Sequence, residues 1–107
     1  MQETKSKPDV FQAIADPTRR EILVLLSEQE MPIAAITKCF TISRTAVNKH
    51  LNVLSEAGLV NSKKTGRETR YGLKPNSLDE VKQWLSYFDR YWNEKLVALK
   101  NFVESDE

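Results

Sequence analysis

The sequence predicts a mainly α-helical fold with one small β-hairpin, an α+β class with the element order α-α-α-α-β-β-α. Three observations predict it. Apolar residues recur at helical spacing along most of the chain. One basic segment, residues 59–74, has a strand–turn–strand pattern around a glycine instead. The length of 107 residues and an apolar content of 40% suffice for one modest core, so a single domain over residues 8–104 is expected.

The predicted N-terminal half is helical, and its first helix is expected to be one of two long terminal helices that form a dimer interface. Apolar spacing indicates a first helix over about residues 8–15. Asp16 followed by Pro17 is typical of an N-cap and a first helical position, because proline there lacks only an N–H that would go unpaired anyway. The second helix that they open should end near residues 27–30.

A helix-turn-helix is predicted over residues 33–57. A short helix over about 33–40 is followed by a break and by Ser43, which is placed to cap a longer helix that runs to Ala57. Gly58 is the expected stop, since glycine accepts the left-handed backbone that often ends a helix.

The C-terminal part is predicted to be one long helix. Ser77 and Glu80 have the spacing of a capping box, and the apolar periodicity continues from Leu78 to about Glu104. Such a helix would be about 40 Å long. Flexible tails are expected at residues 1–7 and 105–107.

Charge is segregated along the chain although the formal net charge is only +1. Residues 43–75 carry seven basic and two acidic side chains, a local net charge of +5, whereas residues 1–42 sum to −1 and residues 76–107 to −3. A basic middle between neutral and acidic ends is typical of a charged binding surface.

The helix after Ser43 has completely separated polar and apolar faces at 100° per residue. A polar face alone is also typical of a solvated helix, but the basic hairpin that follows favours DNA binding. A helix-turn-helix with such a hairpin is a winged helix. The predicted major-groove contacts are Ser43, Arg44, Thr45, Asn48, Lys49 and Asn52, and the predicted wing contacts are Lys63, Lys64, Arg67 and Arg70.

Several runs resemble one family of regulators. The runs are residues 11–23 (FQAIADPTRREIL), residues 43–51 (SRTAVNKHL), residues 54–60 (LSEAGLV) and the spacing Arg67-x-x-x-Tyr71-x-Leu73. Together they are similar to the ArsR–SmtB family of bacterial winged-helix repressors. The resemblance implies a homodimer on an inverted-repeat operator in double-stranded DNA, repressing until an effector of unknown identity releases it.

The metal ligands of many such relatives are missing here. The positions that align with their cysteine pair hold Pro32 and Ala34, and the last helix has no His. No metal and no cofactor are therefore expected. The single cysteine, Cys39, excludes an internal disulfide and is interpreted as a small hydrophobic residue, with a redox thiol as the alternative.

No catalytic residues are predicted. The single histidine, His50, falls on the apolar face of its helix and is interpreted as a hydrogen-bonded core residue, not a DNA contact or a base. Arg19 and Arg20 are expected to make structural contacts. An enzyme is thus disfavoured, and the alternative to a DNA-binding regulator is a winged helix that binds a protein partner.

The last helix is predicted to form a homodimer with the first helix. Its apolar stripe is too long for the core of one small domain, and Lys95 lies within it. The predicted interface consists of Val10, Phe11, Ile14, Val81, Leu85, Phe88, Trp92 and Leu99. A ligand pocket beneath Trp84, Tyr87, Phe88 and Trp92 remains an alternative.

No membrane partner is expected, because no apolar run approaches the ~20 residues that a membrane span needs. The N-terminus is polar and has no apolar segment typical of a signal peptide, so a cytoplasmic location is expected.

Overall fold

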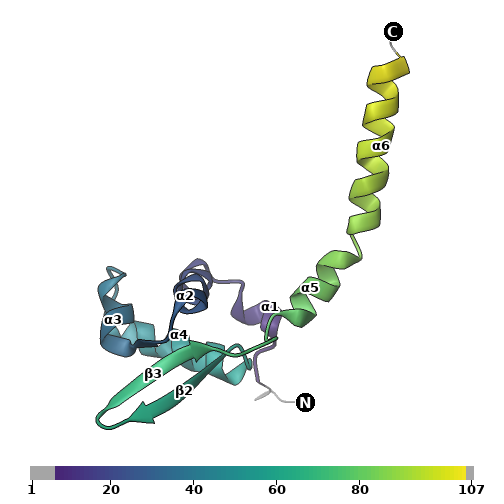
Figure 1. Cartoon of the computed structure of the whole chain (residues 1–107). Coiled ribbons are helices and arrows are strands. Elements are labelled where there is room, and N and C mark those ends of the chain that lie inside the picture. The colour runs from purple at the N-terminus through teal and green to yellow at the C-terminus, as the bar shows by residue number, and fades with distance from the viewer. Residues whose placement is uncertain (1–6, 106–107) are drawn as a thin grey trace, which may run out of the picture.

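The computed structural model describes residues 7–105 and consists of helices around one small antiparallel sheet (Figure 1). The predicted tails lie outside these residues except for Lys7 and for Ser105, which still belongs to the last helix. In chain order the elements are α1 (Val10–Ala13), α2 (Pro17–Glu28), β1 (Met31–Pro32), α3 (Ile33–Lys38), α4 (Arg44–Glu56), β2 (Val60–Thr65), β3 (Glu68–Leu73), α5 (Asp79–Ser86) and α6 (Asp89–Ser105).

The first helix, α1, has only four residues, so the prediction of a long N-terminal helix is wrong. Asp9 and Gln12 close a capping box at its start, with Gln12 N donating to Asp9 Oδ1 (2.7 Å) and Asp9 N to Gln12 Oε1 (2.8 Å). Because so short a helix is marginal by itself, it depends on its neighbours.

Two arginines of α2 hold the end of α1. Arg19 Nε donates to the carbonyl of Ala13 and Arg20 Nη1 to that of Ile14, both at 2.7 Å. These carbonyls are among those that a helix end leaves unpaired. The predicted structural role of Arg19 and Arg20 is therefore confirmed.

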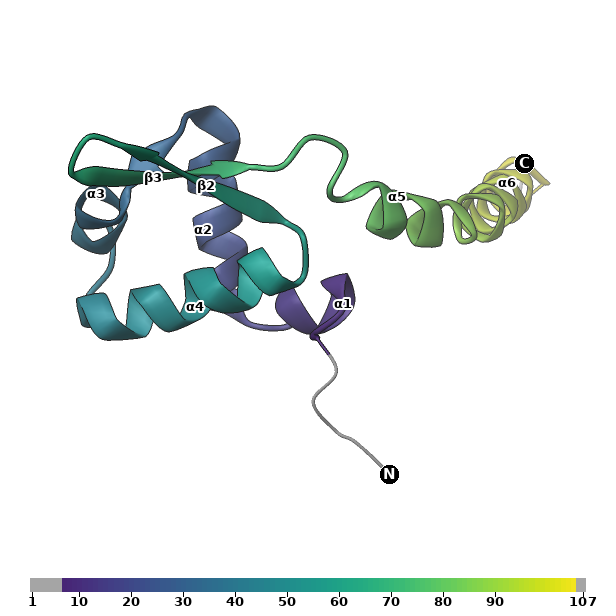
Figure 2. The same cartoon turned by 90° about the horizontal axis from the view of Figure 1, so that it is seen from below.

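The core lies between α2, α3, α4 and the sheet. Figure 2 shows α2 passing between the sheet and α4. Each of these elements contributes its apolar face, and no polar or charged residue of the described chain is buried. The largest fully buried side chains are Ile22, Ile36, Val47, Leu51, Leu54 and Leu59.

The helix-turn-helix has the predicted caps. Ser43 Oγ accepts a hydrogen bond from Ala46 N (3.1 Å) at the start of α4. Gly58 follows the end of α4 with a φ of +81°, as expected for a left-handed stop. The break between the helices is Cys39–Ser43, because α3 ends at Lys38, two residues earlier than predicted.

The sheet has three strands in the order β1-β3-β2, one more than predicted. In the hairpin, Thr65 pairs with Glu68 across a Gly66–Arg67 turn in which Gly66 has a φ of +64°. The added strand, β1, pairs Met31 with Tyr71. A two-residue strand that ends in proline has no periodicity to recognise, and proline is tolerated there because the strand lies at the edge.

The predicted capping box before the last helix is wrong. A turn in which Ser77 N donates to Lys74 O (3.2 Å) and Asn76 adopts a φ of 61° places Ser77 ahead of the helix. The helix begins at Asp79 after Leu78, which provides no side-chain cap. The Oγ atom of the half-buried Ser77 is shielded from solvent and makes no hydrogen bond to the described residues.

The predicted single last helix is also wrong, because it is divided into α5 and α6. At the break, Tyr87 N and Phe88 N donate to the carbonyls three residues before them instead of four. Ser86 Oγ donates to Gln83 O (2.6 Å), a contact of the kind that bends helices.

The α6 helix extends away from the rest of the molecule (Figure 1). The extents are 68 × 39 × 25 Å and the radius of gyration is 19.3 Å, against about 13 Å for a compact chain of this length. Within residues 7–105, no helix is long and apolar enough to cross a membrane.

Candidate nucleic-acid interface

One face of α4 carries the predicted base-reading side chains. Ser43, Arg44, Thr45, Asn48, Lys49 and Asn52 are all exposed. The opposite face is buried through Val47, Leu51 and Leu54. The core thus fixes the rotation of α4 and leaves the whole polar face open, as the faces of the helix predict.

The wing, residues 59–74, adds cations beside this helix. Lys63, Lys64 and Arg67 are exposed, and none of them forms an ion pair within the described part of the chain. Three uncompensated charges on a narrow hairpin suit contacts with phosphates.

Arg70 differs from the other three wing cations. Its Nη1 lies 3.0 Å from Glu68 Oε1, and its Nη2 donates to Glu30 O at 3.3 Å. It is half-buried on β3, opposite Lys63 in the sheet. Arg70 therefore anchors the wing to the body, and its charge is partly compensated.

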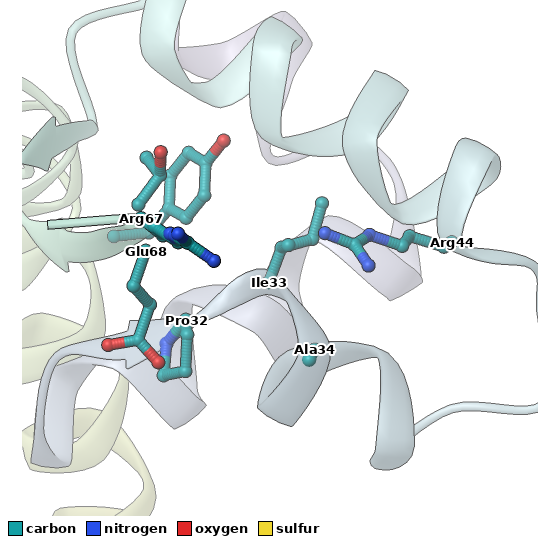
Figure 3. A pocket seen from close by; sticks show the side chains of 8 residues that line it. Pro32, Ile33, Ala34, Arg44, Arg67 and Glu68 are labelled. Carbon is teal, nitrogen blue, oxygen red and sulfur yellow. The ribbon is translucent and has the colours of Figure 1, made fainter. Parts of the chain in front are cut away.

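A cavity of about 430 Å³, hereafter the α3–wing cavity, lies between the start of α3, the start of α4 and the wing (Figure 3). Sequence patterns do not reveal it, because its walls come from three separate segments. It brings Arg44 and Arg67 together and also includes Pro32 and Ala34. The lining residues are Pro32, Ile33, Ala34, Arg44, Arg67, Glu68, Thr69 and Tyr71.

His50 connects α4 to α2 on the side away from the polar face. Its Nδ1 lies 3.3 Å from Arg19 Nη1 and 4.0 Å from Asp16 Oδ2. Its side chain is 23% exposed, so it lies at the edge of the core, hydrogen-bonded as predicted. The backbone N–H of Arg19 donates to Asp16 Oδ2 at 3.0 Å. This hydrogen bond is the main reason why the pKa of Asp16 is lowered below its ordinary value of 3.8.

The predicted interface residues do not all remain exposed. Val10 is only 8% exposed and belongs to the core of its own chain, so including it in the interface is wrong. Phe11 stacks edge-on against Trp84 with ring centroids 5.5 Å apart, and Val81 packs on the core. Leu85, Phe88, Trp92 and Leu99 stay 40–60% exposed.

The aromatic residues do not enclose a large pocket. Trp84 packs edge-to-face against Phe88 with ring centroids 5.1 Å apart. A hollow of about 220 Å³ is lined by Phe11, Glu80, Gln83, Trp84 and Tyr87. Trp92 lies outside this hollow and packs edge-to-face against Tyr91, with ring centroids 5.2 Å apart.

Cys39 is exposed at the end of α3, so its interpretation as a buried hydrophobic residue is wrong. Among residues 7–105, no three His, Cys, Asp or Glu side chains gather closely enough to hold a metal ion.

The helix-turn-helix, its exposed polar helix and the basic hairpin define a winged helix-turn-helix regulatory protein. The chain belongs to the arsR family of bacterial regulatory proteins, whose model matches residues 16–62. The family consists of transcriptional regulators, and the chain is not an enzyme.

Similar proteins extend the match beyond these residues. The transcriptional repressor SdpR of Bacillus subtilis is 36% identical over 75% of this chain and 89% of that protein. The HTH-type regulator Rv2034 of Mycobacterium tuberculosis is 33% identical over 96% of this chain and 94% of that protein. The structure of an ArsR-like regulator from Rhodococcus superposes with a TM-score of 0.66 at 36% identity, covering 87% and 88% of the two chains.

Proposed function

We propose that this chain is a sequence-specific repressor that binds an inverted-repeat operator in double-stranded DNA as a homodimer and does not respond to metal ions. The observation that carries the proposal is the exposed polar face of α4 beside three wing cations that have no ionic partner within residues 7–105. Its similarity to SdpR, itself a repressor, supports repression.

The residue roles follow from reach and charge. Arg44, Thr45, Asn48, Lys49 and Asn52 project from a helix that fits a major groove, with Ser43 at its start, and their donors and acceptors match those of base edges. Lys63, Lys64 and Arg67 neutralise backbone phosphates. Arg70 acts mainly by fixing the wing.

The exposed apolar surface supports a homodimer. Large apolar side chains between Trp84 and Val103 remain about half exposed, and neither α5 nor α6 has a buried residue. Such a patch usually marks an interface. A symmetric dimer would present two α4 helices to two half-sites, so its expected operator is palindromic.

Independence from metal rests on the residues present. Pro32 and Ala34 offer no ligand atoms from their side chains at the start of α3, and the described residues hold no suitable cluster elsewhere. Zinc or arsenite at micromolar concentration should leave DNA affinity unchanged.

The test is a gel shift on duplexes selected from a random pool. Arg44→Ala/Lys49→Ala should weaken binding to the selected site by at least tenfold, because bidentate base contacts contribute about 1–3 kcal/mol each. Lys82→Ala/Lys100→Ala removes the same charge from α5 and α6 and should leave binding unchanged. Unaltered affinity in the first variant would contradict the assigned base contacts.

The salt dependence separates DNA binding from the alternative of a protein-binding module. Replacing Lys63, Lys64 and Arg67 with alanine should reduce the slope of log affinity against log salt by about 0.9 for each phosphate that is no longer neutralised. A wild-type protein without salt-sensitive DNA binding would favour the protein-binding module instead.

A further inference from the structure

The α3–wing cavity has the size and position of a small-molecule site. Its volume of about 430 Å³ falls within the usual range for ligand pockets, about 300–1,000 Å³. It lies directly beside the proposed DNA-contacting face, because two residues assigned to that face, Arg44 and Arg67, form part of its wall.

The cavity is positively charged. Figure 3 shows the side chains of Arg44 and Arg67 reaching toward one another across it from α4 and from the wing. Neither guanidinium has an ion-pair partner within residues 7–105. Glu68 is the acidic residue of the lining, and its Oε1 is 3.0 Å from Nη1 of Arg70, a cation that does not line the cavity.

The remaining lining is suited to an apolar body. Pro32, Ile33 and Ala34 form one wall, and the half-buried Tyr71 contributes an aromatic ring. Two guanidinium groups bind phosphate or carboxylate oxygens well, since their paired N–H donors match those anions. The lining therefore fits a small organic anion that carries an apolar group.

We propose that the α3–wing cavity binds such an organic anion, a phosphate or carboxylate on an apolar body, and that this ligand excludes DNA. The exclusion rests on the proposed function, because the anion occupies the two arginines assigned to DNA. The anion competes with a DNA phosphate for Arg67 and with base edges for Arg44, so the anion and DNA bind alternately.

Binding to the free protein is measured by calorimetry with phenyl phosphate at fixed ionic strength. The wild type should bind one molecule per chain, more tightly than inorganic phosphate because the ring is buried against apolar residues. Arg44→Gln/Arg67→Gln should lose at least tenfold in affinity. Lys63→Gln/Lys64→Gln removes the same charge outside the cavity and should bind normally.

Three outcomes would overturn the cavity assignment. The first is no binding to the wild type at about 10 mM phenyl phosphate, a concentration well above the dissociation constant of a weak site, about 1 mM. The second is an equal loss of affinity in the two double variants. The third is equal affinity for phenyl phosphate and inorganic phosphate. All replaced residues are exposed, and circular dichroism of each variant confirms that it is folded. This measurement needs no DNA, so it decides the cavity assignment even if the proposed function fails.

Exclusion is measured by titrating DNA in the presence of phenyl phosphate. At ten times its dissociation constant, a mutually exclusive ligand weakens apparent DNA affinity about tenfold. Ala34→Phe places a large side chain in the cavity without removing a proposed DNA contact. This variant should keep its DNA affinity, and phenyl phosphate should no longer weaken it. Undiminished wild-type DNA affinity at saturating phenyl phosphate would overturn exclusion while leaving DNA binding itself established.

Discussion

At the scale of single residues, the contacts of Arg19 join three helices. Its side chain donates to the α1 carbonyls of Gln12 and Ala13, and its Nη1 lies within hydrogen-bond distance of His50 on α4. Asp16 completes the group by capping α2 through Arg19 N. The position of α1, part of the proposed dimer contact, is therefore tied to the helix that carries the proposed base contacts.

Asp16 makes this group sensitive to acid. Its pKa is lowered in the folded chain, chiefly by the Arg19 N–H, so its contribution to stability is present above its unfolded pKa of 3.8 and is lost as pH falls through the folded value. Asp16→Ala should lower the free energy of unfolding at pH 7 by about 1 kcal/mol, typical of removing an N-cap side chain.

Asp16→Asn keeps a capping oxygen but does not titrate. In urea unfolding followed by circular dichroism, the stability of the wild type relative to this variant should therefore decline as pH is lowered below about 4. If the difference in free energy of unfolding between the wild type and Asp16→Asn is the same at neutral pH and at a pH of about 2.5, ionised Asp16 contributes nothing beyond the cap.

At the scale of elements, the sequence identified what local chemistry determines. Asp16, Ser43 and Gly58 mark ends of α2 and α4 because capping depends on a few neighbouring atoms. The polar face of α4 followed from helical periodicity alone. β1 escaped prediction because its pairing with residues 70–71 is a long-range contact of two residues.

The C-terminal helices show the limit of the same reasoning. The apolar spacing continues across Ser86–Phe88, so periodicity indicated one helix where the backbone hydrogen bonds shift and divide it. Likewise, the α3–wing cavity depends on how three elements pack, and the sequence pattern of each element contains no sign of it.

Gly58 gives a direct test of a predicted element boundary. Its φ is +81°, and a Cβ added there would meet no atom within 4 Å, so replacement costs backbone strain alone. Gly58→Ala should lower the free energy of unfolding by about 1–2 kcal/mol in urea titrations. Gly58→Asn should lose less, because asparagine tolerates this conformation better. Equal stability of the alanine variant and the wild type would contradict a strained stop at this position.

At the scale of the whole molecule, the extended shape is the main evidence for assembly. The core uses α1 to α4 and the sheet, while α6, about 26 Å long, has no buried residue. Its apolar residues from Tyr91 to Val103 fall mostly on one arc of about 140° at 100° per residue. Lys95 lies within this arc, with its Nζ 5.5 Å from the centre of the Tyr91 ring. A second copy of the same stripe would cover it.

The position of the seam can be tested with two variants of one helix. Leu99 lies within the apolar arc and Val97 on the opposite side, and their exposed fractions are similar at 59% and 56%. Leu99→Glu should therefore shift the protein from dimer to monomer in sedimentation velocity at micromolar concentration, whereas Val97→Glu should remain dimeric. Because neither residue belongs to the core, both variants should keep the wild-type circular dichroism.

The Leu99→Glu monomer should also lose most of its affinity for a palindromic duplex, since one α4 then reads one half-site. Dimeric Leu99→Glu, or monomeric Val97→Glu, would show that α6 pairs through another face.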